Sequence, residues 1–195
     1  QIQHETYSSN CRDVVREFYE QISTRNSSDP VSEQLAEFWK AKRSVILTMV
    51  DRADELAHVL MDQDPAYVLC HGDLHPGNVL VCENGELRIV DWDDPIYAPK
   101  EHDLMCFGGG LGFAGESRKE NELFYKGYGQ CEIDPEALAY YRYERIVADV
   151  AAFGEEIFGQ QGSVEDRKVS LKLLMNQFQP NEVVEAAHKT YEKLF

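Results

Sequence analysis

The positions of apolar residues predict two helices in the first third of the chain. Apolar side chains recur at three- and four-residue spacing from Asn10 to about Ser23 and from Ser32 to about Met61, as Leu35 and Phe38 illustrate. This spacing places them on one side of a helix, where they can pack against a core. We therefore expect a helical segment over residues 1–66.

Between residues 67 and 92 the pattern changes to short apolar runs, which are typical of strands. The pair Asn84-Gly85 separates the last two runs and is a strong signal for a two-residue type I′ turn, so we predict an antiparallel hairpin. In that register Asn78 faces Asp91 at the open end of the hairpin. The predicted strands are Tyr67–Cys70, Val79–Cys82 and Leu87–Trp92.

From Glu101 to the end of the chain the spacing is helical again. No internal repeat and no long linker divides the 195 residues, so we expect a single α+β domain, mainly helical, with a small β-hairpin. The loops and the hairpin occupy residues 67–110, and a second helical segment occupies 111–195. The expected helices are 101–107, 117–129, 135–158, 164–178 and 181–194.

The charge of the chain narrows the choice of partners. Thirty-five acidic and nineteen basic side chains give a formal net charge of −16. This charge repels nucleic-acid phosphates and anionic lipid and attracts cationic solutes. A cationic small molecule is therefore a favourable partner, and nucleic acids and membranes are unfavourable ones. Acidity that only keeps the protein soluble is an equally good interpretation of the charge by itself.

Cysteine spacing and hydropathy indicate the compartment. The five cysteines include no C-x-x-C pair, so neither a disulfide framework nor a zinc site is predicted. No apolar run is long enough to cross a membrane, and residues 1–10 do not have the basic and apolar regions of a signal peptide. We expect a cytoplasmic protein.

The strongest chemical signal is a polar loop, HGDLHPGN at residues 71–78, which leads into the hairpin. It contains a carboxylate at Asp73 and a carboxamide at Asn78, and Asp91 follows the hairpin. A small set of oxygen ligands suits Mg²⁺, which keeps its waters and binds phosphate oxygens. Kinases use this order of residues to orient an acceptor hydroxyl against metal-held phosphates. We predict Asp73 as the catalytic base and Asn78 and Asp91 as metal ligands. Singly, Asp73 would fit a turn and Asn78 a strand start, so the prediction depends on all three.

The sequence HGDLHPGN followed by IVDWDDP resembles the catalytic and metal loops of aminoglycoside phosphotransferases and their choline-kinase-like relatives. DWDDPIYAPKEHDLMCFGGG and YYRYERIVADVAAFGEE are similar to the spectinomycin phosphotransferase branch, so the resemblance covers about residues 67–158. It implies the C-terminal lobe of a protein-kinase-like fold. It also implies Asp73 as the catalytic aspartate, Asn78 and Asp91 as Mg²⁺ ligands, and ATP or GTP as phosphate donor.

Three further residues are assigned with the help of this resemblance. His75 stands where the similar protein kinases carry a Lys near the transferred phosphate, so it is a candidate for nucleotide phosphate binding, with a structural role equally open. His71 is expected to be a packed, hydrogen-bonded support. Asp103, in the downstream helix of the family, is expected to anchor the catalytic loop.

Three acids are candidates for contacts with substrate or for support of the site. Asp93 follows the metal aspartate and could meet a substrate amine, although Asp-Asp-Pro is also ordinary turn chemistry. Glu144 and Asp149 lie in the expected helix 135–158, whose mixture of aromatic and acidic residues would suit a pocket for a cationic sugar. A buried aromatic side and a solvated acidic face are the favoured interpretation of most of that helix.

The nucleotide-binding features of a complete phosphotransferase are missing from the pattern. Such an enzyme needs a glycine-rich loop over the phosphates and a strand Lys paired with a helix Glu. Neither precedes Tyr67, and the glycines at 108–115 follow Asp91. Because the chain also starts without Met, we expect the nucleotide-binding lobe to lie upstream of Gln1 and the chain alone to be inactive. A naturally shortened protein is the alternative.

These observations predict the catalytic lobe of a small-molecule kinase. It would transfer the ATP γ-phosphate to a hydroxyl of a cationic aminoglycoside or aminocyclitol, an activity of the antibiotic-resistance type. The alternatives are a kinase of a choline-like amine or another small alcohol, and a catalytically silent binding module. Retention of Asp73, Asn78 and Asp91 favours an enzyme, because a binding module has no chemical need for all three.

Overall fold

Helices make up most of the structure, a computed structural model that describes residues 2–22, 29–106, 118–129 and 131–195. The predicted mainly helical α+β class is correct, and the predicted helices recur with ends shifted by a few residues. The glycine-rich stretch 108–115 lies outside the described residues. The helices are α1 (Asn10–Ile22), α2 (Pro30–Gln63), α3 (Glu101–Leu104), α4 (Arg118–Tyr128), α5 (Pro135–Phe158), α6 (Val164–Gln177) and α7 (Val183–Tyr191), with 3₁₀ turns η1 (Pro76–Asn78) and η2 (Glu192–Leu194).

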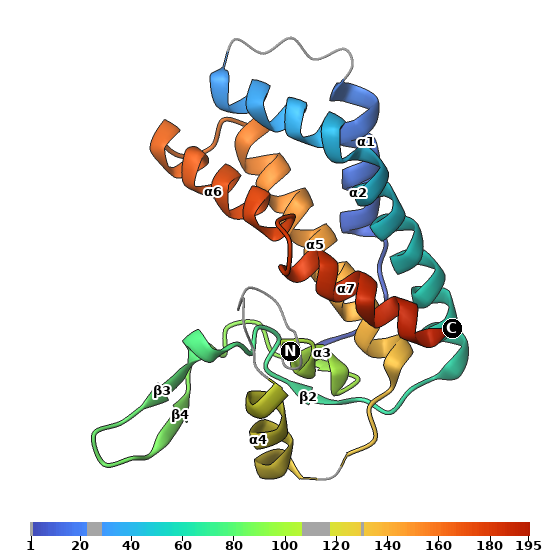
Figure 1. Cartoon of the computed structure of the whole chain (residues 1–195), viewed down its shortest axis with the longest axis vertical. Helices are drawn as coiled ribbons and strands as arrows, with labels where there is room; N and C mark the ends of the chain where they lie inside the picture. The colour runs from blue at the N-terminus through green and yellow to red at the C-terminus, as the bar shows by residue number, and fades with distance from the viewer. Residues whose placement is uncertain (1, 23–28, 107–117, 130) are drawn as a thin grey trace.

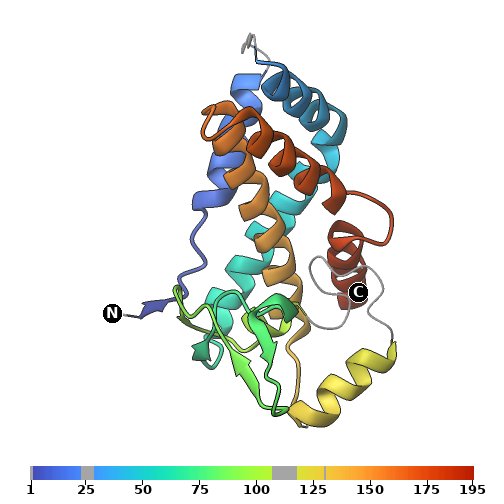
Figure 2. The same cartoon turned by 90° about the vertical axis from the view of Figure 1, so that its left-hand side faces the viewer.

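Helix α5 is the central element of the helical body. It packs against α1, α2, α3, α6 and α7, and it runs through the middle of the bundle in both views (Figures 1 and 2). It begins where the sequence predicts, because the Asp134 carboxylate accepts hydrogen bonds from the backbone N–H groups of Glu136 and Ala137. Pro135 fits the first helical position, where no N–H group is needed.

Aromatic rings bring α1 and α2 close to α5. The ring of Trp39, which is fully buried, meets Phe18 and Phe158 edge-on, with centroids 5.4 and 5.8 Å away. A Cβ atom at Gly154 would lie 2.9 Å from Phe18 Cε2 and 3.2 Å from Trp39 Cη2. The rings therefore occupy the space that a side chain at position 154 would need.

Short strands lie at one end of the helical body and form two small sheets. Strand β5 pairs with β1 in parallel and with β2 in antiparallel orientation, which gives the order β1-β5-β2, and β3 pairs with β4. We did not predict β1 and β5, because two or three residues are too few to show an alternating pattern. The strands are β1 (Gln3–His4), β2 (Val68–Cys70), β3 (Val79–Val81), β4 (Leu87–Ile89) and β5 (Ile96–Ala98).

The hairpin β3–β4 is present as predicted, but its predicted turn is wrong. The Cys82 N–H donates to the Glu86 carbonyl at 2.8 Å, and the Gly85 N–H donates to the Cys82 carbonyl at 2.9 Å. The loop therefore has three residues, 83–85, and not two. Gly85 has φ of +82°, as expected for a type I turn that is followed by a left-handed bulge residue.

This turn shifts the register of the hairpin by one residue. Val81 pairs with Leu87, and the Val90 N–H donates to the Asn78 carbonyl at 3.0 Å, so Asn78 lies opposite Val90 and not opposite Asp91. Asp91 has φ of +69°, where the chain turns out of the strand direction. The direction of the Asp91 side chain therefore depends on this backbone turn, and not on the strand alternation from which we predicted it.

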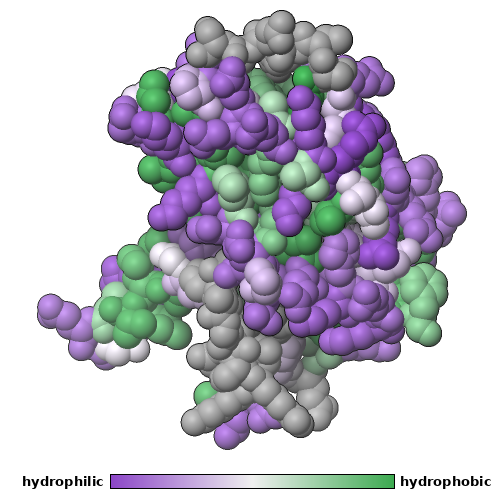
Figure 3. Space-filling model, turned by 45° about the horizontal axis from the view of Figure 1, so that its top comes forward, coloured by the Kyte–Doolittle hydropathy of each residue, from purple (hydrophilic) through white to green (hydrophobic). Residues whose placement is uncertain are grey.

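The outer surface of the hairpin is apolar. Val81 and Leu87 are 73% and 67% exposed, and Leu80 and Ile89 are exposed as well. In Figure 3 the projecting hairpin at the left is largely green, whereas much of the visible surface of the helical body is purple.

The cysteines and the apolar character of the helices bear on the environment of the protein. All five cysteines are free thiols. Among the described residues, no helix combines the length and the apolar character that crossing a lipid bilayer requires.

Candidate active site

Asp103 of α3 holds the start of the loop at residues 71–78. Its Oδ2 accepts the backbone N–H of His71 at 2.7 Å, and its Oδ1 accepts that of Gly72 at 3.1 Å. Burial acts to raise the pKa of Asp103, but the neighbouring His102 side chain and the hydrogen bonds from the His71 and Gly72 N–H groups outweigh it and leave the pKa below its ordinary value. The carboxylate is therefore charged, which strengthens both hydrogen bonds to the loop.

Gly72 brings this loop into contact with the segment that follows Asp91. Gly72 has φ of +93°, and a Cβ atom there would lie only 2.3 Å from the carbonyl oxygen of Asp94. Only glycine fits both the backbone conformation and the close approach. The two loops predicted to carry the catalytic and metal-binding residues are thus packed backbone to backbone.

His71 connects the same two loops through its ring. Its Nε2 lies 2.9 Å from the Val90 carbonyl oxygen, and its Nδ1 accepts the Asp73 N–H at 3.3 Å. A carbonyl only accepts and an N–H only donates, so Nε2 carries the proton and the ring is neutral. The buried ring also lies 4.6 Å from the Trp92 ring. Both ring nitrogens of His71 are occupied by the backbone.

Asn78, the last residue of the loop, is buried, and its side-chain amide points toward the backbone of Asp73. Its Nδ2 donates to the Asp73 carbonyl oxygen at 2.9 Å. Because the nitrogen faces the loop, Oδ1 is the atom that Asn78 could offer to a cation. Among the described residues no group of three or more His, Cys, Asp or Glu side chains could hold a metal. A Mg²⁺ site here would therefore rely on Asn78, Asp91, waters and phosphate oxygens.

His75 caps the turn η1 and lies beside Asp73. Its Nδ1 accepts the Gly77 N–H at 3.0 Å, so the ring proton of the neutral form is on Nε2. That nitrogen lies 3.6 Å from Asp73 Oδ2, which is longer than a hydrogen bond. The His75 ring is one-third exposed and lies near Oδ2, the carboxylate oxygen of Asp73 that Arg145 does not bind.

Arg145 of α5 contacts the other oxygen of the Asp73 carboxylate, and we did not predict this contact. Its Nη1 lies 2.8 Å from Asp73 Oδ1, and its Nε lies 3.3 Å from Asp149 Oδ1. Asp149 in turn accepts Gln177 Nε2 at 2.7 Å. Burial raises the pKa of Asp149, and Arg145 opposes that effect. The one feature of the sequence that could have pointed to Arg145 is its spacing of four residues from Asp149, which places both side chains on one side of a helix.

A model of the phosphotransferase enzyme family matches residues 12–141, which is more than half of the chain and includes both loops. The chain belongs to this family. The match ends before Arg145.

Two crystal structures of spectinomycin phosphotransferase APH(9)-Ia are similar to the chain. The complex with ADP and spectinomycin is 39% identical with a TM-score of 0.86, and the match covers 98% of this chain and 58% of that chain. The AMP-bound complex is 40% identical with a TM-score of 0.85, and the match covers 96% of this chain and 58% of that chain. A search of curated proteins finds no match. These relatives confirm the predicted kinase-like fold and its helical C-terminal lobe.

Glu144 differs from the other acidic candidates for the site, because its ion pair is with another helix. It forms an ion pair with Arg12 of α1, which also binds Asp54 of α2 through a 2.6 Å contact between Nε and Oδ1. Burial raises the pKa of Glu144 to about 7, although the charge of Arg12 acts against the rise. The structure therefore separates Glu144, which links helices, from Asp149, which contacts Arg145.

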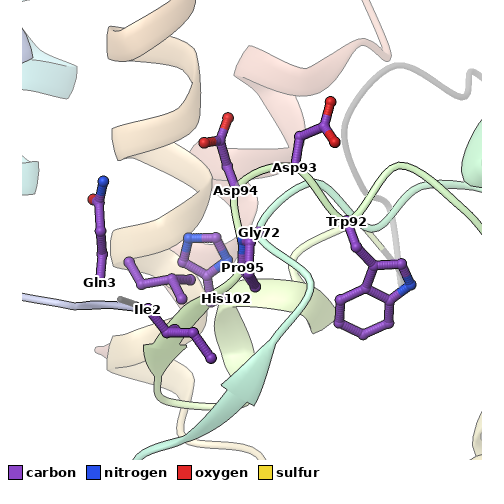
Figure 4. A pocket seen from close by; sticks show the side chains of 9 residues that line it. Ile2, Gln3, Gly72, Trp92, Asp93, Asp94, Pro95 and His102 are labelled. Atoms are coloured by element: carbon purple, nitrogen blue, oxygen red, sulfur yellow. The ribbon is translucent and has the colours of Figure 1, made fainter.

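Asp93 and Asp94 border a pocket of about 500 Å³ beside the two loops. Figure 4 shows their carboxylates pointing to the same side and Trp92 pointing away from them. Gly72 and His102 also line this pocket. Asp93 is thus both an exposed turn residue and part of a pocket wall.

Proposed function

We propose that the chain is the catalytic lobe of an ATP-dependent kinase for a cationic aminoglycoside- or aminocyclitol-like substrate. The arrangement of Asp73 carries this proposal. Its side chain is 44% exposed, Arg145 binds one carboxylate oxygen, and Asn78 binds the backbone beneath it. A carboxylate with one oxygen fixed by an arginine and the other accessible to solvent suits the binding of an acceptor hydroxyl.

In the proposed reaction Asp73 orients the acceptor hydroxyl and takes its proton. The new bond forms between the acceptor oxygen and the γ-phosphorus of ATP, the bond to the β-phosphate oxygen breaks, and ADP leaves. Asn78 and Asp91 would hold Mg²⁺, which neutralises charge on the β- and γ-phosphates when it is bound.

Other residues of the site have supporting roles in this proposal. His71 and Asp103 maintain the loop through the hydrogen bonds described above. His75, next to the open side of Asp73, is the candidate for contact with the transferred phosphate.

Charge and similarity support the proposed substrate class. The net charge of −16 attracts cations, and Asp93 adds a carboxylate to the pocket wall beside the loops. A similar structure holds ADP and spectinomycin, so this aminocyclitol is the first substrate to test. The chain spans 58% of the length of that relative. We propose that the adenine base is bound by a region that corresponds to the part of this relative outside the match.

The experiment measures phosphate transfer from ATP to spectinomycin by the full-length protein that contains residues 1–195. We expect Asp73→Asn to lower the rate by roughly 10²- to 10⁴-fold, with nucleotide affinity nearly unchanged, because asparagine keeps the shape and loses the basic charge. Asp62→Asn, at an exposed position near the end of α2, is the matched control.

Three results would change the proposal. Full activity of the Asp73→Asn protein would remove Asp73 as the base. Transfer to a choline-like amine and not to spectinomycin would replace the substrate class. Nucleotide binding without transfer to any of these alcohols would favour a silent binding module.

A further inference from the structure

We propose that Arg145 is a positioning residue for the catalytic carboxylate. The inference rests on the proposed function, since it concerns the orientation of Asp73 during phosphate transfer. Arg145 lies outside residues 12–141, the part of the chain that the family model matches. Its role therefore has to be argued from its contacts.

Arg145 binds one oxygen of the Asp73 carboxylate and leaves the other free for a hydroxyl. The distance from Nη1 to Oδ1 is 2.8 Å, which is a charge-assisted hydrogen bond. The second oxygen, Oδ2, is 3.6 Å from His75 Nε2. One fixed oxygen restricts rotation of the carboxylate, so Oδ2 keeps a defined direction toward a bound substrate.

Arg145 is itself held in place by the helical body. Its Nε is 3.3 Å from Asp149 Oδ1, one helical turn further along α5. Asp149 accepts a hydrogen bond of 2.7 Å from Gln177 Nε2 of α6. A planar guanidinium bound at two nitrogens cannot turn without breaking a contact. The orientation of Asp73 is thereby coupled to α5 and α6.

A purely structural role is a poor explanation for this contact. The side chains of Asp73 and Arg145 are 44% and 36% exposed, and ion pairs as exposed as this contribute little to folding stability. The same contact has a large effect on geometry, because it determines where a catalytic oxygen points. We therefore expect the substitution of Arg145 to change the rate of transfer more than the stability of the fold.

The test uses the full-length protein with spectinomycin and ATP. Arg145→Ala should lower kcat on the order of 10²-fold, the effect of misplacing a reacting group by about 1 Å, while the KM for ATP changes little. Arg145→Lys should keep part of the activity, and added guanidinium should restore part of it to Arg145→Ala. In an Asp73→Asn background, Arg145→Ala should cause no further loss, because Arg145 acts through Asp73.

Arg16→Ala is the matched control. The Arg16 side chain is 37% exposed and forms ion pairs with Asp13, Asp51 and Asp54, within α1 and α2. This variant should keep kcat and should not respond to guanidinium.

The outcomes separate this inference from the proposed function. If the unsubstituted protein phosphorylates no acceptor, the proposed function fails, and this inference fails with it. If the unsubstituted protein is active and Arg145→Ala keeps its kcat, only the inference fails. A lower kcat that follows loss of folded protein, without rescue by guanidinium or by Arg145→Lys, would also overturn it.

Discussion

Hydrogen bonds within the loop at residues 71–78 decide which atoms remain for a ligand. His71 uses both ring nitrogens on the backbone, and Asn78 uses its amide nitrogen on the Asp73 carbonyl. Asn78 Oδ1 and Asp73 Oδ2 therefore remain as the oxygens that a cation and a hydroxyl could meet. Asn78 and Asp73 thus each keep one oxygen for a ligand, and this makes their proposed roles separable by single substitutions.

Asp91→Asn should produce a defect different from that of Asp73→Asn. Removal of a direct ligand weakens Mg²⁺ binding, so the Asp91→Asn protein should need more Mg²⁺ as well as transfer phosphate more slowly. Titration of Mg²⁺ in the full-length protein measures both effects. Excess Mg²⁺ should recover part of the rate of the Asp91 variant and none of the rate of the Asp73 variant.

The reverse pattern, in which Mg²⁺ restores the Asp73 variant alone, would exchange the two roles. An unchanged Mg²⁺ requirement in the Asp91 variant would remove Asp91 from the metal site. Asp62→Asn serves as the control for the loss of one carboxylate at an exposed position.

At the scale of elements, α5 joins the site to the rest of the fold. One side of this helix carries Arg145 toward Asp73, and Glu144 contacts Arg12 of α1. Near its C-terminal end, Gly154 meets the rings of Phe18 and Trp39. The position of Arg145 therefore depends on packing between α5 and the helices α1 and α2.

Gly154→Ala tests this packing. Alanine is the better helix former by about 1 kcal/mol, but its Cβ would lie 2.9 Å from Phe18 Cε2. Overpacking costs roughly 1–3 kcal/mol, because the rings must move to admit the methyl group. After the gain in propensity we expect a net destabilisation of up to about 2 kcal/mol. Urea unfolding followed by circular dichroism measures the change.

The control for helix propensity is Ala152→Gly, at an exposed position of the same helix. It should cost about 1 kcal/mol through propensity alone. A Gly154→Ala protein more stable than the unsubstituted one would show that the rings adapt without cost, and that the helices are not packed as tightly as the distances indicate.

At the scale of the whole molecule, a helical body supports a small group of loops and strands at one end (Figure 2). The helices position Asp103 and Arg145 so that both contact the loop at residues 71–78. The apolar hairpin projects from that end, with Val81 and Leu87 largely exposed. The candidate site is thus built where the helices, the loops and the hairpin meet.

We expect the 195-residue chain by itself to transfer phosphate at a negligible rate. In phosphoryl transfer, positioning of the nucleotide and stabilisation of its charge supply most of the catalysis. The relatives solved with nucleotide are longer, and the chain spans 58% of their length. Transfer to spectinomycin by the purified chain and by the full-length protein should be compared at equal concentration. Equal rates would overturn this prediction.

Local patterns predicted the helices and the hairpin well, because the determinants of these elements lie close together in the chain. Helix α5 begins and ends at the predicted residues, Pro135 and Phe158. Its start was predictable because the pair Asp134-Pro135 provides both the cap and the first helical residue. The hairpin was predicted from Asn84-Gly85, but the predicted register was wrong by one residue, because glycine also serves as the bulge residue of a three-residue loop.

The sequence alone placed Asp73 and Asn78 in one loop and Asp91 directly after the hairpin that follows it. That the three residues form one site stays a prediction. The tertiary structure alone decided which side chains surround Asp73. Arg145 is 72 residues away in sequence, and no local rule relates two positions so far apart. Helical periodicity places Glu144 and Asp149 in different directions, but only packing decides which direction faces the loop.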